Sequence, residues 1–359
     1  MNLSASGVVS RRLVSQHLHE PHGHQAEQIV AWLGGVQAQD YAGAKWSIGL
    51  RSRSTEVEIE KAITDLRIIR TWAFRGTLHF IAATDVSWLL ALLAPVVVAA
   101  NKRRYRQLEL DEATFSRSTS LIRGMLESDR PHTRNEIAGV LENEGISTKG
   151  QRAPHLLQRA ALDGAICLGP QRGREPTYLL LPKRINPTTS LTHTRALTEL
   201  VERYFTSHGP ATVQDFSWWS GLPTSAVREA LENSQSLVAV DGTDFWAGID
   251  KPADLSESAH LLSRFDEYLL GYKDRSSVLD PAFGKKINAG GGMLRPAIIV
   301  NGNVAGVWKQ TKNKDRLLVS AELFRSLEDN ENQVLETAVQ HYGRFHNSTV
   351  EFRSSLSSG

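Results

Sequence analysis

The chain has 359 residues, of which 22% are charged and 41% are hydrophobic. This composition is typical of a folded globular protein with two or three folding units, and it excludes a disordered or fibrous chain. With 41 Lys and Arg against 39 Asp and Glu, the net charge is only +2, so total charge gives no argument for nucleic-acid binding.

One cysteine and one long apolar run indicate the cellular compartment in which we expect the protein. The single cysteine, Cys167, excludes an intramolecular disulfide and a multi-cysteine zinc site, and it suits a reducing compartment. We expect this thiol to be a packing residue of the core. The longest apolar run, Val86–Ala100, is shorter than the ~18 residues that span a bilayer and contains Pro95, so we interpret it as one or two buried helices. The start of the chain has no long apolar signal segment. We therefore expect a cytoplasmic protein with no membrane partner.

Residues 1–100 predict four helices and then a hairpin. Apolar residues recur at helical spacing over 8–18, 25–33, 39–53 and 55–67. The stretch IIRTWAFRGTLHFIAA then has two β-prone halves about Arg75-Gly76, which indicates a hairpin. We interpret this segment as a loose first winged helix.

Two neutral amides lie between the second and third of these helices, in GGVQAQDYAGAKW at Gly34–Trp46. Gln37 and Gln39 are one residue apart. Glutamine takes no proton at neutral pH, but its amide both donates and accepts hydrogen bonds. Chemistry at this motif would therefore depend on positioning and not on basicity. The alternative is that the amides only satisfy backbone groups or cap a turn.

Residues 116–181 predict a clearer winged helix. They contain a first helix, a second helix led by Pro131, a third helix over 152–164 and a hairpin whose turn is GPQRGREP. This order is that of a winged helix-turn-helix, in which the third helix enters a groove of DNA and the tip at Arg172–Arg174 forms the wing.

The same order returns 79 residues later, counted from Pro131 to Pro210. We expect Thr212 and Thr224 to be helix N-caps or first-turn residues, and Pro223 is a start signal for the third helix of this copy.

From about Ala259 the pattern becomes β-rich. Asn301-Gly302 marks a tight hairpin between RPAIIV and NVAGVWKQ, and a late helix is expected over Ala321–Tyr342. The predicted fold class is α+β, mainly α, with three tandem winged helix-turn-helix motifs and a C-terminal β-rich element. The predicted ranges are 1–100, 101–185, 186–255 and 256–359.

Tandem winged helices suggest double-stranded DNA as the partner, and docking to another protein is the alternative. Lys and Arg gather in predicted loops and helix starts, where they would contact phosphates. The DNA-binding candidates are Lys45, Arg51, Lys149, Arg152, Arg172, Arg174, Lys273, Arg275, Lys285, Lys286 and Arg295. Lys273 and Arg275 have an alternative role, an internal ion-pair set with Asp266.

No cofactor or metal motif is found in the sequence. His17, His19, His22 and His24 lie close together, but no cysteine or partnered carboxylate stands at metal-binding spacing. GxxxxGK[ST] and GxSxG motifs are also absent. We therefore expect neither a metal nor a cofactor.

Several stretches in chain order resemble the AlkZ-type winged-helix DNA glycosylase family: VQAQD, RTWAFRGTLHFIAATD, DFSWWSGLP, and RFDEYLLGYKDR followed by NGNVAGVWK. The resemblance covers nearly the whole chain. It implies a C-shaped, concave DNA channel and removal of N7-alkylated purines, including unhooking of interstrand crosslinks, in DNA repair or self-resistance to a genotoxic natural product. The family's Gln-x-Gln signature falls on Gln37, Ala38 and Gln39. A sister branch carries an acid at the second position, so Gln39 places the chain nearer the crosslink-unhooking type.

The chemistry that this resemblance implies is compatible with amides. N7-alkylation makes the purine a cation and therefore a good leaving group, so the enzyme has chiefly to hold a water in line. We expect Gln37 and Gln39 to position that water and to contact the sugar-phosphate. Asp40 is the competitor for the role of base, or else a helix N-cap. No lysine other than Lys45 adjoins the motif, so we do not expect a Schiff-base step.

Two further pairs of residues have two interpretations each. Thr77 and His79 either face the channel from the first wing or are structural. Trp218 and Trp219 are expected in the core and not as base-stacking platforms.

For the whole chain, the rival hypothesis is a non-catalytic winged-helix DNA-binding regulator. We expect the protein to be a monomer.

Overall fold

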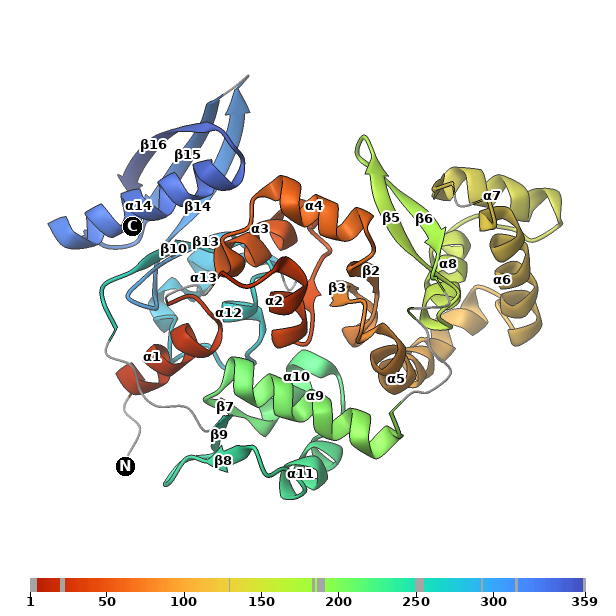
Figure 1. Ribbon diagram of the computed structural model, residues 1–359, viewed down its shortest axis with the longest axis horizontal. Coiled ribbons are helices and arrows are strands. Elements are labelled where there is room, and N and C mark those ends of the chain that lie inside the picture. Colours follow the sequence, from red (N-terminus) through yellow and green to blue (C-terminus); the bar gives the residue numbers. More distant parts are fainter. Residues whose placement is uncertain are drawn as a thin grey trace. The chain divides into compact units, whose positions relative to one another are not determined.

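The computed structural model describes residues 5–19, 23–128, 130–182, 185, 191–248, 255–291, 293–313 and 316–357 (Figure 1). The chain forms two compact units. Unit 1 comprises residues 1–59 and 198–359, and unit 2 comprises residues 60–197. Helices and antiparallel strands occur in both units, which confirms the predicted α+β class. The two units do not coincide with the four consecutive ranges predicted from the sequence, which stay a prediction about modules.

Unit 2 begins within α4 (Glu56–Thr64) and is built on one sheet. Its elements are β2 (Ile68–Trp72), η1 (Phe74–Gly76), β3 (Leu78–Ala82), α5 (Val86–Gln107), α6 (Glu112–Leu126), β4 (His132–Thr133), α7 (Arg134–Asn143), α8 (Arg152–Leu162), β5 (Ile166–Arg172) and β6 (Glu175–Leu180). Within this unit the strands lie in the order β3-β2-β5-β6-β4. The predicted hairpins at Arg75-Gly76 and at Gly173 are confirmed.

The core of unit 2 is apolar, as the helical spacing predicted. Leu156, Leu157, Ala160 and Ala161 form one buried stripe of α8, which joins a cluster with residues of α6 and α7. Burial raises the pKa of the Cys167 thiol to about 12, so this cysteine is a packing residue as expected.

The apolar run at 86–100 is part of one helix, α5, which continues to Gln107 with Pro95 inside it. Among the described residues, α5 is the helix whose length and apolar composition would also suit a membrane crossing. Tyr105 near its end packs edge-on against Phe115 in the core of unit 2, with ring centroids 4.9 Å apart.

The repeat predicted from the sequence has a counterpart in unit 1. The elements there are α9 (His193–His208), β7 (Ala211–Thr212), α10 (Val213–Ser220), α11 (Thr224–Glu232), β8 (Leu237–Ala239) and β9 (Phe245–Gly248). They follow the same order as α6 to β6. In both copies the first short strand pairs with the last strand, because β4 pairs with β6 and β7 pairs with β9.

Equivalent capping boxes start the second helix of each copy. Thr133 accepts a hydrogen bond from the Glu136 N–H, and the Glu136 carboxylate accepts from the Thr133 N–H. Thr212 and Asp215 form the same reciprocal pair at α10. Thr212 is therefore an N-cap and Thr224 is a first-turn residue of α11, and both roles are among those predicted.

The C-terminal part of unit 1 is a five-stranded sheet. Its strands, in the order β10-β13-β14-β15-β16, are β10 (Ala259–Leu261), β13 (Ala297–Val300), β14 (Asn303–Asn313), β15 (Arg316–Leu323) and β16 (Thr349–Leu356). Asn301 (φ 50) and Gly302 (φ 77) form the predicted tight turn between β13 and β14. Helix α14 (Asp329–Phe345) connects the parallel strands β15 and β16.

The predicted start of the late helix at Ala321 is wrong. Residues 316–323 alternate between buried and less buried positions, which is the pattern of a half-buried strand. The helix begins only at Asp329, where Glu328 and Glu331 form a capping box.

The remaining elements of unit 1 include those that carry the Gln-x-Gln stretch. They are α1 (Ala5–Ser15), α2 (Ala26–Trp32), β1 (Val36–Gln37), α3 (Tyr41–Ser52), α12 (Glu267–Leu270), η3 (Pro281–Phe283), α13 (Gly284–Ile287), β11 (Asn288–Gly290) and β12 (Met293–Leu294). Helix α3 is held against α14, since Trp46 packs edge-on against Tyr342 and Phe345, with ring centroids 4.8 and 5.1 Å away.

The capping box of α7 gives a test of the local fold. Thr133→Ala removes the side-chain oxygen that accepts the Glu136 N–H, and loss of such a cap costs about 1 kcal/mol. We expect the amides of the first turn of α7 to exchange with deuterium about fivefold faster. Thr337→Ala, at an exposed position inside α14, is the control. Equal exchange in α7 of both variants would contradict the capping role.

Candidate active site

The Gln-x-Gln segment lies in unit 1, on the short connection between α2 and α3. Gly34 (φ 75) makes the turn after α2, and a Cβ at this position would lie 3.2 Å from the Trp219 ring. Gln37 is 7% exposed, whereas Gln39 is exposed. The two amides therefore differ, because one is largely packed and the other reaches solvent.

Asp40 closes this segment as the N-cap of α3. Its carboxylate accepts a hydrogen bond from the Gly43 N–H at 3.1 Å. A Cβ at Gly43 would lie 2.7 Å from the other carboxylate oxygen, so a larger residue here would require the Asp40 side chain to shift. The N-cap interpretation of Asp40 is confirmed.

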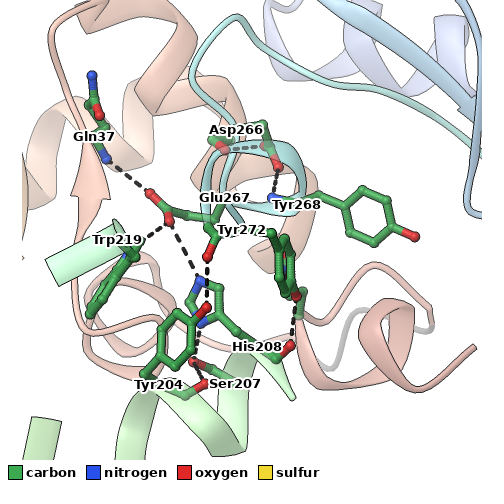
Figure 2. A network of polar contacts seen from close by, with 12 residues as sticks. Gln37, Tyr204, Ser207, His208, Trp219, Asp266, Glu267, Tyr268 and Tyr272 are labelled. Carbon is green, nitrogen blue, oxygen red and sulfur yellow. Dashed lines mark hydrogen bonds and ion pairs between the residues drawn. The ribbon is translucent and has the colours of Figure 1, made fainter. Parts of the chain in front are cut away.

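A buried carboxylate holds the start of the segment. Glu267, which is 1% exposed, accepts a hydrogen bond from the backbone N–H of Gln37 at 3.4 Å through Oε1. Its Oε2 accepts the indole N–H of Trp219 at 2.9 Å and lies 3.5 Å from His208 Nε2. Figure 2 shows these partners converging on Glu267, with the side-chain amide of Gln37 directed away from it.

Aromatic rings pack around His208. The Tyr204 ring stacks on it with centroids 4.6 Å apart, and the Tyr272 hydroxyl donates to the backbone carbonyl of His208 at 2.6 Å. A Cβ at Gly271 would lie 2.7 Å from the imidazole, so this glycine allows the close packing. Burial raises the pKa of Tyr272 to about 12, so its hydroxyl stays a donor at physiological pH.

The neighbouring acid, Asp266, forms a buried ion pair. Its carboxylate contacts Arg51 at 2.7 and 2.9 Å, and both side chains are 0% exposed. Burial alone would raise the pKa of Asp266, but the charge and hydrogen bonds of Arg51, with those of Ser47 and the Tyr268 N–H, hold it below its usual value. The pair joins α3 to the N-terminus of α12. It thereby fixes the position of Glu267, the first residue of α12.

Sequence reasoning missed Glu267. It stands beside Asp266 in RFDEYLLGYKDR, and three apolar residues that are also buried follow it. Two adjacent acids before such an apolar run were the available signal.

Two of the DNA-binding candidates are buried, and their assignment is wrong. Arg51 is committed to Asp266 and Gln16. Lys45 is 5% exposed and its ammonium lies 2.8 Å from the carboxylate of Glu56. A side chain enclosed in the protein interior cannot reach a phosphate.

Five other candidates bind groups within the protein. Arg152 donates to the carbonyls of residues 108, 109 and 147; Arg172 contacts Glu136 and the Pro131 carbonyl; Arg275 donates to the Leu269 carbonyl; Lys286 donates to Ser357; and Arg295 contacts Glu322 and the Lys286 carbonyl. The predicted ion-pair set of Asp266 with Lys273 and Arg275 is therefore wrong, since Asp266 binds Arg51. The exposed candidates besides Arg172 are Lys149, Arg174, Lys273 and Lys285.

Thr77 and His79 are satisfied within unit 2. The Thr77 hydroxyl donates to the Phe74 carbonyl at 3.1 Å. His79 is 1% exposed, its Nδ1 lies 3.1 Å from the Thr77 carbonyl, and its ring packs edge-on against Phe74. The structural interpretation of this pair is confirmed over the channel-facing one.

The prediction for the tryptophan pair is half right. Trp219 is 1% exposed, as expected, whereas Trp218 is 49% exposed. Adjacent helix positions point about 100° apart, so α10 turns only one of the two rings into the core.

Among the described residues, which exclude His22, the structure has no group of three or more metal-ligating side chains.

Comparisons with known proteins agree on one family. The family model described as DNA glycosylase AlkZ-like matches residues 30–345. A curated relative, the interstrand DNA cross-link repair glycosylase of Streptomyces sahachiroi, is 25% identical over 329 residues, covering 86% of this chain and 88% of the relative. The solved structure of the Streptomyces sahachiroi DNA glycosylase AlkZ has a TM-score of 0.81 at 24% identity, covering 99% of this chain and 100% of that one.

The buried pair Arg51–Asp266 gives a stability test. Asp266→Asn removes the anion and leaves an uncompensated buried guanidinium, so we expect a loss of about 3–5 kcal/mol in the free energy of unfolding, measured with urea. Because the folded-state pKa of Asp266 is lowered, this stabilisation is present above the unfolded pKa and is lost as pH falls through the folded one; the variant should be less acid-sensitive. Lys61→Ala, at an exposed pair with Asp65, should change stability by less than about 0.5 kcal/mol. Equal losses in both variants would contradict the stabilising role of the buried pair.

Proposed function

The chain belongs to the AlkZ-like DNA glycosylase family, and from this premise we propose that it hydrolyses the N-glycosidic bond of bulky N7-alkylated purines, including those tied into interstrand crosslinks. As a member of that family it is a DNA N-glycosylase, and its substrate is DNA. The observation that carries the finer proposal is the Gln37–Gln39 segment. It is anchored at both ends and exposes one amide immediately before α3.

The proposed mechanism uses positioning and no general base. An N7-alkylated purine already carries positive charge, so its departure needs no acid, and the sugar becomes oxocarbenium-like as the bond breaks. Gln39 is exposed and accepts and donates hydrogen bonds, so its amide holds a water and contacts the sugar-phosphate. Gln37 supports the same water from the packed side. Oriented groups contribute up to ~7–11 kcal/mol in favourable cases.

The two carboxylates beside the segment support this assignment. Asp40 accepts the Gly43 N–H, and Glu267 accepts the N–H groups of Gln37 and Trp219. Both carboxylates accept hydrogen bonds within the protein, and we propose that the amides are the polar groups that meet the substrate.

The aromatic residues of α3 support attack without a deep base pocket. Tyr41 is 8% exposed and Trp46 is 2% exposed, and the Trp46 indole N–H donates to the Leu261 carbonyl. Both rings are committed to the protein core. A crosslinked base stays tied to the opposite strand and cannot swing out as a flipped base does. We propose that the bond is approached from a groove.

The DNA-binding architecture is part of the proposal. We assign residues 1–100, 101–185 and 186–255 to three winged helices and 256–359 to a β-rich element, together forming a C-shaped, concave DNA channel. The repeated order of elements and strand pairing supports the second and third of these modules. The curated relative is named for interstrand crosslink repair, and we propose the same task for this chain, as a cytoplasmic monomer, in DNA repair or self-resistance.

The glutamines give the central test of function. We expect Gln37→Ala and Gln39→Ala each to lower the single-turnover rate of N7-alkylguanine release by about 10²-fold, the size of effect seen when reacting groups are mispositioned. Release is measured as strand cleavage at abasic sites after heat or alkali. Gln340→Ala, at an exposed position of α14, should keep the wild-type rate.

Two outcomes would contradict this assignment in different ways. Wild-type rates for both glutamine variants would remove their catalytic role but keep the enzyme. Salt-dependent binding of alkylated duplex by the wild-type protein, with no strand cleavage at all, would favour the DNA-binding regulator.

Exposed basic residues give a separate test of the DNA surface. Each phosphate contact contributes about 0.9 to the slope of log affinity against log salt concentration. We expect Lys149→Ala and Arg174→Ala each to reduce that slope by about this amount, measured by duplex titration at several salt concentrations. Lys45→Ala, which changes a buried lysine, should leave the slope unchanged; a drop in this variant alone would overturn the assignment.

A further inference from the structure

We propose that Glu267 is a positioning residue for base excision: its carboxylate holds the backbone of Gln37 and thereby sets the place of the two amides. The inference rests on the proposed role of Gln37 and Gln39. It concerns a side chain that is 1% exposed and that acts through the segment it anchors.

The position requires a side chain that only accepts hydrogen bonds. Glu267 Oε1 faces the N–H of Gln37 at 3.4 Å, and Oε2 faces the indole N–H of Trp219 at 2.9 Å. Both partners are donors without acceptor capacity at these atoms. A carboxylate satisfies both, whereas the nearly isosteric glutamine has one acceptor oxygen and would turn its N–H₂ group toward one of the two donors.

On the side away from Gln37 the carboxylate faces His208. His208 Nε2 lies 3.5 Å from Oε2, and the Ser207 hydroxyl lies 2.8 Å from His208 Nδ1. Ser207 also donates to the Arg203 carbonyl at 2.7 Å, within α9. His208 is therefore held within α9 through Nδ1, while its Nε2 faces the carboxylate without a hydrogen bond. Figure 2 shows α9 residues lining this side of Glu267.

A carboxylate accepts a backbone N–H near each end of the segment. Glu267 binds the N–H of Gln37, and Asp40 caps α3 through the N–H of Gly43. We expect loss of the Glu267 contact to shift the backbone at Gln37, while the Asp40 cap keeps the start of α3 in place. The expected consequence is a misplaced pair of amides in a folded protein.

The experiment uses Glu267→Gln in the full chain. We expect the single-turnover rate of N7-alkylguanine release to fall by about 10²-fold, while affinity for undamaged duplex stays within about twofold of wild type. Trp219→Phe removes the indole donor and leaves the Gln37 contact intact, so its excision rate should stay within about fivefold of wild type. The control for loss of a mostly buried acid is Glu331→Gln, whose carboxylate binds Arg325 on another part of unit 1; its excision rate should be unchanged.

The double variant Glu267→Gln with Trp219→Phe tests the acceptor argument. With the indole N–H gone, the glutamine oxygen accepts from Gln37 and its N–H₂ no longer meets a donor. We expect the double variant to excise at least about tenfold faster than Glu267→Gln alone, a rescue that a merely structural role would not produce. Deuterium exchange at the Gln37 amide gives a second readout: slow in wild type, faster in Glu267→Gln and slow again in the double variant.

The outcomes separate this inference from the proposed function. Wild-type excision by Glu267→Gln, or no rescue in the double variant, overturns the positioning role and leaves the glycosylase intact. Should Glu267→Gln fail to fold, fast exchange of the Gln37 amide in wild type overturns the inference. Absence of excision by the wild-type protein overturns the proposed substrate and not the anchor, which the exchange measurement still reports.

Discussion

The arrangement of the candidate site depends on the buried ion pair of Arg51 and Asp266. Burying two charges is costly, and the cost is offset here by two contacts between them and by further hydrogen bonds. Ser47 and the Tyr268 N–H donate to Asp266, and the Gln16 side-chain oxygen accepts from Arg51. The pair ties α3 to the start of α12. Because Glu267 follows Asp266 directly, the same pair fixes the carboxylate that meets the Gln37 backbone. Stability and the placement of the site are thus two results of one interaction.

Carboxylates near the Gln-x-Gln segment are used to build it. Asp40 follows the segment and caps α3. Glu267 accepts the backbone N–H of Gln37, at the start of the segment. Most hydrolases of glycosidic bonds give such acids a catalytic role. A leaving group that already carries positive charge removes that need, so the chemistry proposed for this DNA glycosylase matches a site whose acids are structural and whose exposed group is an amide.

The repeated module serves two purposes in the two units. In unit 2 it places a hairpin with an exposed tip at Arg174 beyond a closed apolar core. In unit 1 the copy supplies Trp219 from α10, whose indole N–H donates to Glu267, and His208 from α9, which lies beside the same carboxylate. Both copies have the same capping box and the same strand pairing. They differ in what their buried residues contact.

The sequence by itself determined the features that depend on near neighbours: the helices of the repeat, the cap at Thr212, the Asn301-Gly302 turn and the Gln-x-Gln motif at the start of α3. Periodicity and turn chemistry act over a few residues, so one sequence is enough to read them. Tertiary structure decided what distant partners settle. Arg51 is buried because Asp266, 215 residues away, binds it, and Glu267 becomes an anchor because Gln37, 230 residues away, meets it. No local pattern distinguishes Trp218 from Trp219 or a phosphate-binding lysine from the buried Lys45, since burial is a property of the folded neighbourhood and not of the residue.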